Sequence, residues 1–125
     1  MPSITVGASF ESAVASGAKK AHIIRRRKRE QDRIAAMSNL TIYASRARKI
    51  VRIIDTVCTS TRPIFRVRPG YWAFNDAPRA LDLSKRDLEQ LAVELGFPAA
   101  KDLDAHFTRE FRTETITGLV LVRWR

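Results

Sequence analysis

The chain has 125 residues, of which 45% are hydrophobic and 29% are charged. This length and composition are enough to close one hydrophobic core, so they exclude a mainly disordered chain and predict a single domain over residues 1–125. The lone cysteine, Cys58, excludes an intrachain disulfide and favours a reducing compartment. No His or acidic residue stands near Cys58 in sequence, so we expect a buried strand residue rather than a nucleophile.

No apolar run approaches the roughly 18 residues that a membrane span needs. The segment Met1 to Phe10 has neither a basic region nor a long apolar region of the kind found in signal peptides. We therefore expect a soluble, unsecreted protein of the cytoplasm that makes no membrane contact.

The N-terminal third predicts two strands and a helix before a basic loop. Residues 4–6 alternate as a short strand, and residues 10–14 then show helical spacing, with Gly17 suited to end that helix. Residues 19–25 predict a strand that runs out into a basic loop, which spans about residues 25–33. Residues 40–43 have strong β propensity and predict another strand.

The middle of the chain is rich in Ile and Val. Residues 50–57 predict a central strand with substantial burial on both faces, and residues 59–61 predict a turn. Pro69-Gly70 predicts a tight turn into a hairpin partner at residues 71–74.

Residues 64–68 alternate between two kinds of side chain. Strand side chains point to opposite faces in turn, so Phe65 and Val67 are expected to point inward. The same alternation predicts that Arg66 and Arg68 point outward to solvent.

The C-terminal third predicts two helices and a strand. Ser84 to Asp87 resembles a capping box ahead of a helix with apolar residues at helical spacing, which Gly96 would end. Leu103, Phe107 and Phe111 predict a second helix, and residues 118–124 a strand inside the sheet. This order of elements describes an α+β fold, with a small curled sheet or β-barrel flanked by helices.

Positive charge is concentrated in one stretch of the chain. Residues 19–52 hold 12 of the 23 Lys and Arg residues but only two acids, Glu30 and Asp32, so this stretch accounts for the whole net charge of +10. Such a concentration of cations releases counterions from phosphate backbones and predicts a polyanion partner, best RNA. A solvated charged loop is the alternative.

The candidate nucleic-acid-binding residues lie in this stretch, in two groups that we expect to be neighbours in space. Arginine predominates, which favours bidentate contact with phosphate. Tyr43, Tyr71 and Trp72 are candidates for base stacking, although aromatic residues on strands also form cores. The candidate cations are Lys19, Lys20, Arg25, Arg26, Arg27, Lys28, Arg29, Arg33, Arg46, Arg48, Lys49 and Arg52.

The order of these features resembles the ASCH domains, small relatives of the RNA-binding PUA fold. Residues 88–97 (LEQLAVELGF), the following helix and residues 118–124 (GLVLVRW) resemble the C-terminal pattern of the family. Residues 17–23 (GAKKAHI) stand where the family has a G-x-K-x-x-T-I signature, followed by a basic run and a strand ending in Tyr43. The resemblance implies a small β-barrel flanked by helices, a cleft beside the signature, RNA-related roles and a phage or prophage origin.

One branch of these domains hydrolyses acetylated cytidine with Lys, Thr and Glu from the cleft. Lys19 matches the signature lysine, but His22 replaces the threonine and Ile24 replaces a usual arginine. A reaction that needs the threonine hydroxyl would lose its attacking atom, so we expect binding rather than catalysis. Lys19 and His22 are the weak catalytic candidates, and His22 also has a purely structural interpretation as a strand residue.

No nucleotide-hydrolysis, dinucleotide-binding, zinc-protease or serine-hydrolase motif is present. The only other histidine, His106, is expected on a distant helix near the core, so we expect no metal and no cofactor. Asp82, Asp102, Asp104 and Glu110 are expected to face solvent. Three hypotheses follow: a nucleic-acid-binding domain for RNA or DNA, an amidohydrolase acting on a modified nucleoside, and a phage-encoded adaptor for a host or virion protein.

Overall fold

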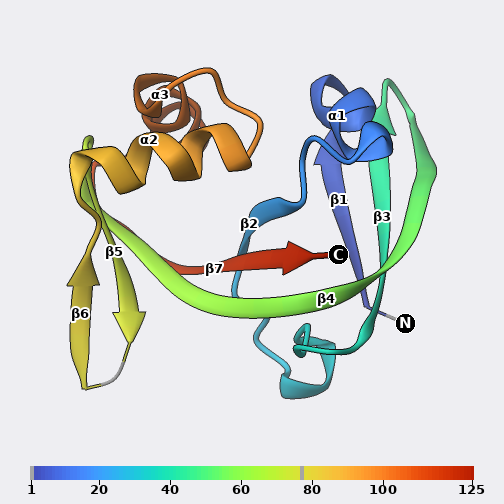
Figure 1. The fold of residues 1–125 in the computed structure, drawn as a ribbon, viewed down its shortest axis with the longest axis horizontal. Coiled ribbons are helices and arrows are strands. Elements are labelled where there is room, and N and C mark those ends of the chain that lie inside the picture. The colour runs from blue at the N-terminus through green and yellow to red at the C-terminus, as the bar shows by residue number, and fades with distance from the viewer. Residues whose placement is uncertain (1, 77) are drawn as a thin grey trace.

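The computed structural model describes residues 2–76 and 78–125, which form a seven-stranded mixed sheet and three α-helices (Figure 1). The sequence prediction of an α+β fold is therefore confirmed. The strands are β1 (Ser3–Gly7), β2 (Ala21–Arg25), β3 (Asn39–Arg46), β4 (Lys49–Arg68), β5 (Tyr71–Asp76), β6 (Arg79–Asp82) and β7 (Ile116–Trp124). The helices are α1 (Glu11–Ser16), α2 (Lys85–Glu94) and α3 (Ala100–Phe111), with short 3₁₀ turns at Ala8–Phe10 and Glu30–Asp32.

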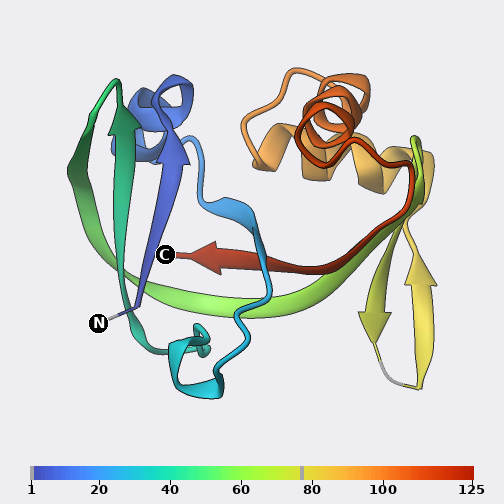
Figure 2. The same cartoon turned by 180° about the vertical axis from the view of Figure 1, so that it is seen from behind.

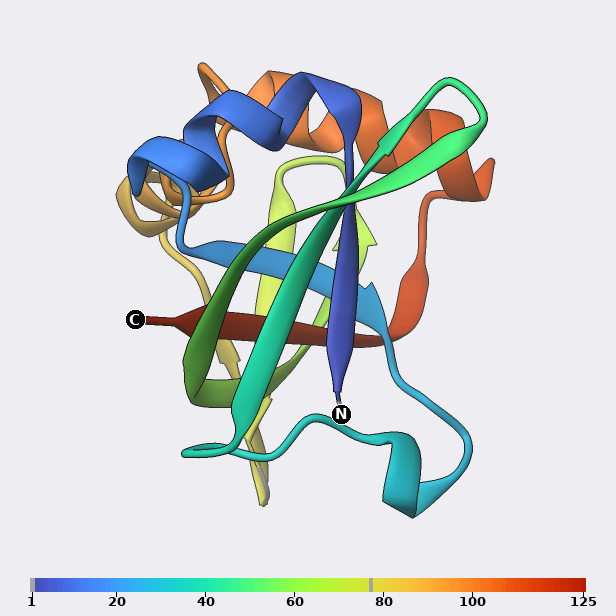
Figure 3. The ribbon, with the colours of Figure 1, turned by 90° about the vertical axis from the view of Figure 1, so that its right-hand side faces the viewer.

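The sheet stays open, so the expectation of a closed barrel is wrong. Its strands run in the order β1-β3-β4-β5-β6, and β7 lies between β4 and β2. Among the described residues, β1 pairs only with β3 and β2 pairs only with β7. Figure 3 shows β1 and β2 crossing steeply rather than lying side by side, so no ladder can join them.

A single long strand, β4, connects the two halves of this sheet. Its first part pairs with β3, and its later part pairs with β7 and β5. Figure 2 shows β4 and β7 running together across the middle of the molecule. The turn expected at residues 59–61 is therefore wrong: Ser60 and Thr61 pair with β7, next to a register shift. β-branched threonine suits a strand, and paired neighbours override its turn tendency.

Two expectations about the burial of β4 are also wrong. Residues 50–57 are not buried on both faces, because Ile50 is 67% exposed and its neighbours are at most half-buried. The predicted alternation at residues 64–68 is wrong for Arg66, which is completely buried together with Ile64, and for Val67, which is 49% exposed. Arg68 lies beyond a register shift and is exposed, as predicted. The short strand β6, which no sequence pattern predicted, completes the sheet beyond β5.

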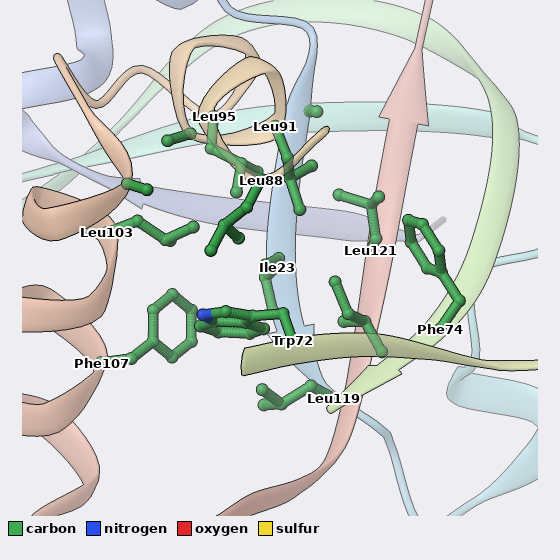
Figure 4. Close-up of a cluster of buried hydrophobic side chains, with 14 of the residues drawn as sticks. Ile23, Trp72, Phe74, Leu88, Leu91, Leu95, Leu103, Phe107, Leu119 and Leu121 are labelled. Carbon is green, nitrogen blue, oxygen red and sulfur yellow. The ribbon is translucent and has the colours of Figure 1, made fainter. Parts of the chain in front are cut away.

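Two hydrophobic clusters fill the molecule, one on each side of the bend in β4. Figure 4 shows the first, in which Trp72 packs edge to face against Phe107 beneath leucines of α2 and α3. The second lies between β1, β3, α1 and the end of β7, and it includes Cys58. Burial raises the pKa of the Cys58 thiol, and the prediction that Cys58 is a buried strand residue is confirmed.

Local capping signals fix the ends of α2. The Ser84 Oγ accepts a hydrogen bond of 3.1 Å from the Asp87 N–H, as the capping box predicts. At the other end Gly96 has φ +95°, and the N–H groups of Gly96 and Phe97 return to the carbonyls of Val93 and Ala92. The predicted end at Gly96 is therefore confirmed.

The remaining C-terminal elements follow from neighbours in space as well as from sequence. α3 has no side-chain cap of its own, and the Glu89 carboxylate of α2 accepts the Ala100 N–H at 3.0 Å instead. β7 lies inside the sheet between β2 and β4, as predicted. No helix in the described part of the chain is both long and apolar enough to cross a bilayer.

Candidate functional site

A cleft opens beside β2, where α3 and the segment around Phe10 approach the strand. Its cavity of about 280 Å³ continues into a wider groove of about 840 Å³ that reaches β1. The open side of the sheet makes this space, because no strand in residues 2–76 and 78–125 pairs with the free edge of β2. The cavity is lined by Phe10, Lys19, His22, Ile23, Ile24, Arg25, Leu95, Phe97, His106, Phe107, Glu110, Phe111 and Leu119.

Flat rings form much of the cavity wall. The ring of Phe10 lies 6.3 Å from that of His22 and 5.5 Å from that of Phe97, both measured between centroids. Phe97 in turn lies 5.4 Å from His106. These edge-on and tilted contacts are favourable for aromatic pairs and fix the orientation of each ring. The cleft thus offers fixed planar surfaces beside polar groups.

Lys19 lies beneath this wall and is only 1% exposed. Its Nζ donates hydrogen bonds of 2.5 Å to the carbonyls of Ala21 and Leu95 and lies 4.7 Å from the Phe10 ring centre. Desolvation by burial, opposed by the negative charge of Glu94, lowers the pKa of Lys19 to about 7. Lys19 therefore ties the start of β2 to the end of α2 rather than lying on the surface with the other candidate cations.

Position 96, next to the Leu95 carbonyl that accepts from Lys19, requires glycine. A Cβ at Gly96 would lie 2.9 Å from the Phe10 ring, and its backbone is in the left-handed region with φ +95°. Only glycine accepts both the conformation and the close approach of Phe10. The glycine that ends α2 therefore also shapes the cleft wall.

His22 and His106 both line the cleft, although the sequence placed them on distant elements. Burial and, to a lesser extent, the nearby Lys19 and His106 together lower the pKa of His22 to about 3. His22 is therefore neutral at physiological pH. The His106 Nε2 lies 3.2 Å from the Glu110 carboxylate one turn along α3, so a polar pair faces the cavity.

Arg25, at the end of β2, connects the cleft with the basic loop. Its guanidinium lies 4.4 Å from the centre of the Phe111 ring, which in turn is parallel to Phe107. A guanidinium over an aromatic face stays positively charged and keeps its N–H groups free to donate. Arg25 is thus a cation in the wall of the cleft.

The rest of the basic loop, residues 26–33, is partly ordered by hydrogen bonds to main-chain carbonyls of the loop itself and of β1. Arg27 donates to the carbonyls of Ser3 and Asp32 at 2.5 and 2.9 Å, and the Arg33 Nε donates to the Arg27 carbonyl at 3.0 Å. The candidate cations outside these contacts are exposed, namely Lys20, Arg26, Lys28 and Arg29.

The basic loop does not have the second group of candidate cations beside it, contrary to expectation; that group consists of Arg46, Arg48, Lys49 and Arg52. Residues 46–52 form the tip of the β3–β4 hairpin, and the basic loop lies at the opposite end of β3 (Figures 1 and 3). The eight residues of β3 separate the tip of the hairpin from the basic loop by roughly 26 Å. Acids partly neutralise the hairpin: Arg46 binds Glu11 through two hydrogen bonds and Arg52 pairs with Asp55, while Arg48 and Lys49 are exposed.

The three aromatic residues proposed for base stacking lie in different environments. Trp72 is 1% exposed, so the expectation that its ring stacks on a base is wrong: the ring belongs to the core. Tyr43 is half-buried on β3. Tyr71 is exposed, and the Arg68 guanidinium lies 4.2 Å from the centre of its ring. Tyr71 is not among the residues that line the cleft.

A buried polar network beneath α3 escaped the sequence analysis, which expected both Arg66 and Asp104 to face solvent. The Asp104 carboxylate accepts from the Trp72 Nε1 at 2.8 Å, the Gly70 N–H at 2.9 Å and the Arg66 guanidinium at 3.4 Å. Asp104 sits between Leu103 and Phe107 on the buried face of α3, and that spacing is the signal that could have revealed it. Arg66 also donates to the carbonyls of Asp104, Thr113 and Glu114.

Comparison with known proteins adds no relative: no protein-family model, no curated protein and no solved structure matches this chain.

Proposed function

We propose that this chain is a nucleic-acid-binding domain, related to the ASCH group of the PUA-like superfamily, with RNA as its preferred partner. The observation that carries the proposal is the continuity of the cleft with the basic loop through Arg25. An uncharged cleft or an isolated charged loop would each be commonplace. Together they match what an unpaired nucleotide requires, which is a place for the base and cations for its phosphates.

The wall of the cleft suits a base better than it suits an aliphatic ligand. Phe10, Phe97 and Phe111 present planar rings, and base–aromatic stacking contributes about 1–3 kcal/mol per base. His106 and Glu110 supply polar atoms that can meet the edge of a base. The phosphates would then lie outside the cavity, where Arg25 and the basic loop concentrate positive charge.

A second candidate function, hydrolysis of a modified nucleoside such as acetylated cytidine, is favoured by one observation. Lys19 lines the cavity, and its pKa of about 7 leaves a substantial fraction of the amine neutral at physiological pH. His22 supplies no hydroxyl where the resemblance expects the threonine nucleophile. Incubating the purified chain with acetylated cytidine tests this function, and intact substrate would argue against it.

Binding of a fluorescent single-stranded RNA across a salt series tests the first proposal. We expect affinity to fall steeply between 50 and 200 mM salt, because cations that contact phosphate release counterions. Replacing Arg25, Arg26 and Arg29 together with Gln should weaken binding by about 100-fold, since each lost phosphate contact lowers the affinity. Single-stranded DNA of the same sequence measures the preference for RNA.

The matched control removes the same charge elsewhere. Lys85, Arg86 and Lys101 are exposed on α2 and α3, away from the cleft and the loop. Their joint replacement with Gln should weaken binding by no more than about threefold, through long-range electrostatics alone. Equal losses in the two triple variants, or an affinity that salt leaves unchanged, would refute the proposed interface.

A further inference from the structure

The basic loop encloses a second cavity, of about 200 Å³, which is distinct from the cleft. Arg26, Arg27 and Arg33 line this cavity, together with Thr61 of β4. Its floor is aliphatic and comes from β2 and β7, including Ile24 and Val120. Three arginines beside aliphatic side chains are suited to an anion that carries a small apolar part.

Hydrogen bonds hold Arg27 and Arg33 in place, and none of the three arginines is neutralised within the described part of the chain. Arg27 uses two of its N–H groups on main-chain carbonyls, and Arg33 uses only its Nε. In residues 2–76 and 78–125, no carboxylate forms an ion pair with any of the three. The remaining N–H groups are therefore free to donate to a bound anion, and the side chains of Arg27 and Arg33 are already fixed.

The size and chemistry of the cavity favour a sugar–phosphate unit. Its volume is below the roughly 300–1,000 Å³ of pockets that enclose whole small molecules. Guanidinium groups match phosphate oxygens in bidentate geometry, and the aliphatic floor suits the apolar face of a sugar. The floor has no aromatic ring, so a base would gain no stacking energy there.

The two cavities are adjacent. Ile24 lines both of them, and the consecutive residues Arg25 and Arg26 serve different ones: Arg25 lines the cleft and Arg26 lines the second cavity. A strand crossing the free edge of β2 could therefore reach both cavities.

We propose that Arg26, Arg27 and Arg33 form a binding pocket for a backbone phosphate of the same nucleic-acid strand whose base enters the cleft. This inference rests on the proposed function and deepens it. The basic loop then acts as a preformed phosphate site on one side of β2, and the strand wraps over the edge of β2 between phosphate and base. Recognition of the phosphate is independent of sequence.

Single substitutions distinguish binding in this pocket from attraction by the overall positive charge of the loop. Arg26→Gln and Arg33→Gln should each weaken binding of single-stranded hexauridylate by about tenfold, because each removes charge-assisted hydrogen bonds. Arg29→Gln removes the same charge from an exposed residue outside the pocket lining and should cost no more than about threefold. Equal losses in all three variants would overturn the pocket while leaving the proposed function intact.

Folding is controlled within the same series. Arg33 supports the loop through its contact with the Arg27 carbonyl. Arg26 is hydrogen-bonded only through its main chain in the described residues, to the Gly118 carbonyl, so Arg26→Gln tests the pocket without loosening the loop. Arg33→Lys keeps the charge but loses the planar fork, and we expect it to recover only part of the affinity. A full recovery would contradict bidentate recognition. Thermal unfolding of each variant confirms that it remains folded.

Two probes distinguish a free phosphate from a phosphodiester. In an NMR titration, inorganic phosphate should shift the amide signals of Ile24, Thr61 and Val120 only weakly, whereas hexauridylate should shift them at much lower concentration. Inorganic phosphate binding as tightly as the oligonucleotide would make the pocket a small-anion site and overturn its assignment to the strand. Hexauridylate that shifts only the cleft signals would overturn the pocket, and absence of any binding would overturn the proposed function itself.

Discussion

The helix-covered side of the sheet and the basic loop both contain cations, but they satisfy those cations in opposite ways. Arg66 and Lys19 are buried, and they donate to carbonyls and a carboxylate of the protein itself. In the loop, Arg26 and Arg29 are exposed, and no carboxylate in the described residues pairs with them. The acceptors around a cation, rather than the local density of charge, therefore separate structural cations from those that are free to bind a ligand.

The largest effect is expected from removing the acceptor of the buried cation. Asp104→Ala leaves the Arg66 guanidinium inside the protein without its carboxylate and orphans the Trp72 Nε1 and the Gly70 N–H. Breaking a buried pair in this way lowers the free energy of unfolding by about 3–5 kcal/mol. Chemical denaturation of the variant and the unchanged chain measures the difference.

Asp102→Ala is the matched control on the same helix. Asp102 lies in the first turn of α3, where its carboxylate interacts with the helix dipole, so we expect a loss below about 1 kcal/mol. A similar loss in both variants would mean that the stability comes from helix electrostatics. The contrast between buried and exposed cations would then lose its energetic basis.

An intermediate effect is expected from Lys19, whose stability contribution depends on pH. Its pKa is about 7 in the folded chain against an ordinary value of 10.5, so between these values the unfolded chain binds more protons. The free energy of unfolding should therefore rise with pH across this window, with a slope of up to about 1.4 kcal/mol per pH unit from this group. Below pH 7 the group is protonated in both states and adds no slope.

Lys19→Met removes the titrating amine and keeps a side chain of similar length. Denaturation of both chains between pH 7 and pH 10 isolates the contribution of Lys19, because other groups titrate alike in the two. We expect a flatter profile in the variant, together with a lower stability at pH 10 from the two lost hydrogen bonds. Parallel profiles would show that Lys19 is not held in its desolvated position.

The smallest effect is expected at the β3–β4 hairpin, which combines exposed cations with acidic partners. Arg46→Gln removes a cation that Glu11 already neutralises, so RNA affinity should change by no more than about twofold. The same salt series that tests the loop measures it. A loss comparable to that of Arg26→Gln would extend the interface along β3 and erase the distinction between paired and unpaired cations.

Local signals in the sequence predicted the helices well. Ser84 and Gly96 mark the two ends of α2 through hydrogen bonds with residues only a few positions away. A local sequence pattern contains both partners of such a contact. The sequence predicted two strands in place of β4, because residues 59–61 have the composition of a turn. Their strand conformation depends on pairing with β7, which lies far along the chain. Pairing between distant segments leaves no mark in a local pattern.

The site was predictable only in part, for the same reason. The resemblance at residues 17–23 pointed to a cleft there, and Lys19 and His22 do line one. The contributions of α3, such as His106, depend on tertiary packing. Arg66 was assigned to solvent because hydrophobicity alone set the phase of its strand, whereas its partner Asp104 lies 38 positions away. A buried charge becomes plausible only when that partner is known.

In the part of the chain that the structure describes, β2 pairs with β7 alone, and this has a consequence for the synthesis of the protein. β2 leaves the ribosome long before residues 116–124 exist, and at about 5–20 residues per second it waits on the order of ten seconds for its partner strand. Until then Ile23 and Ile24 have no neighbouring strand on either side, and the wall of the cleft is incomplete. The site is thus among the last parts of the molecule to form, and a nascent chain should acquire its ligand only after β7 has emerged.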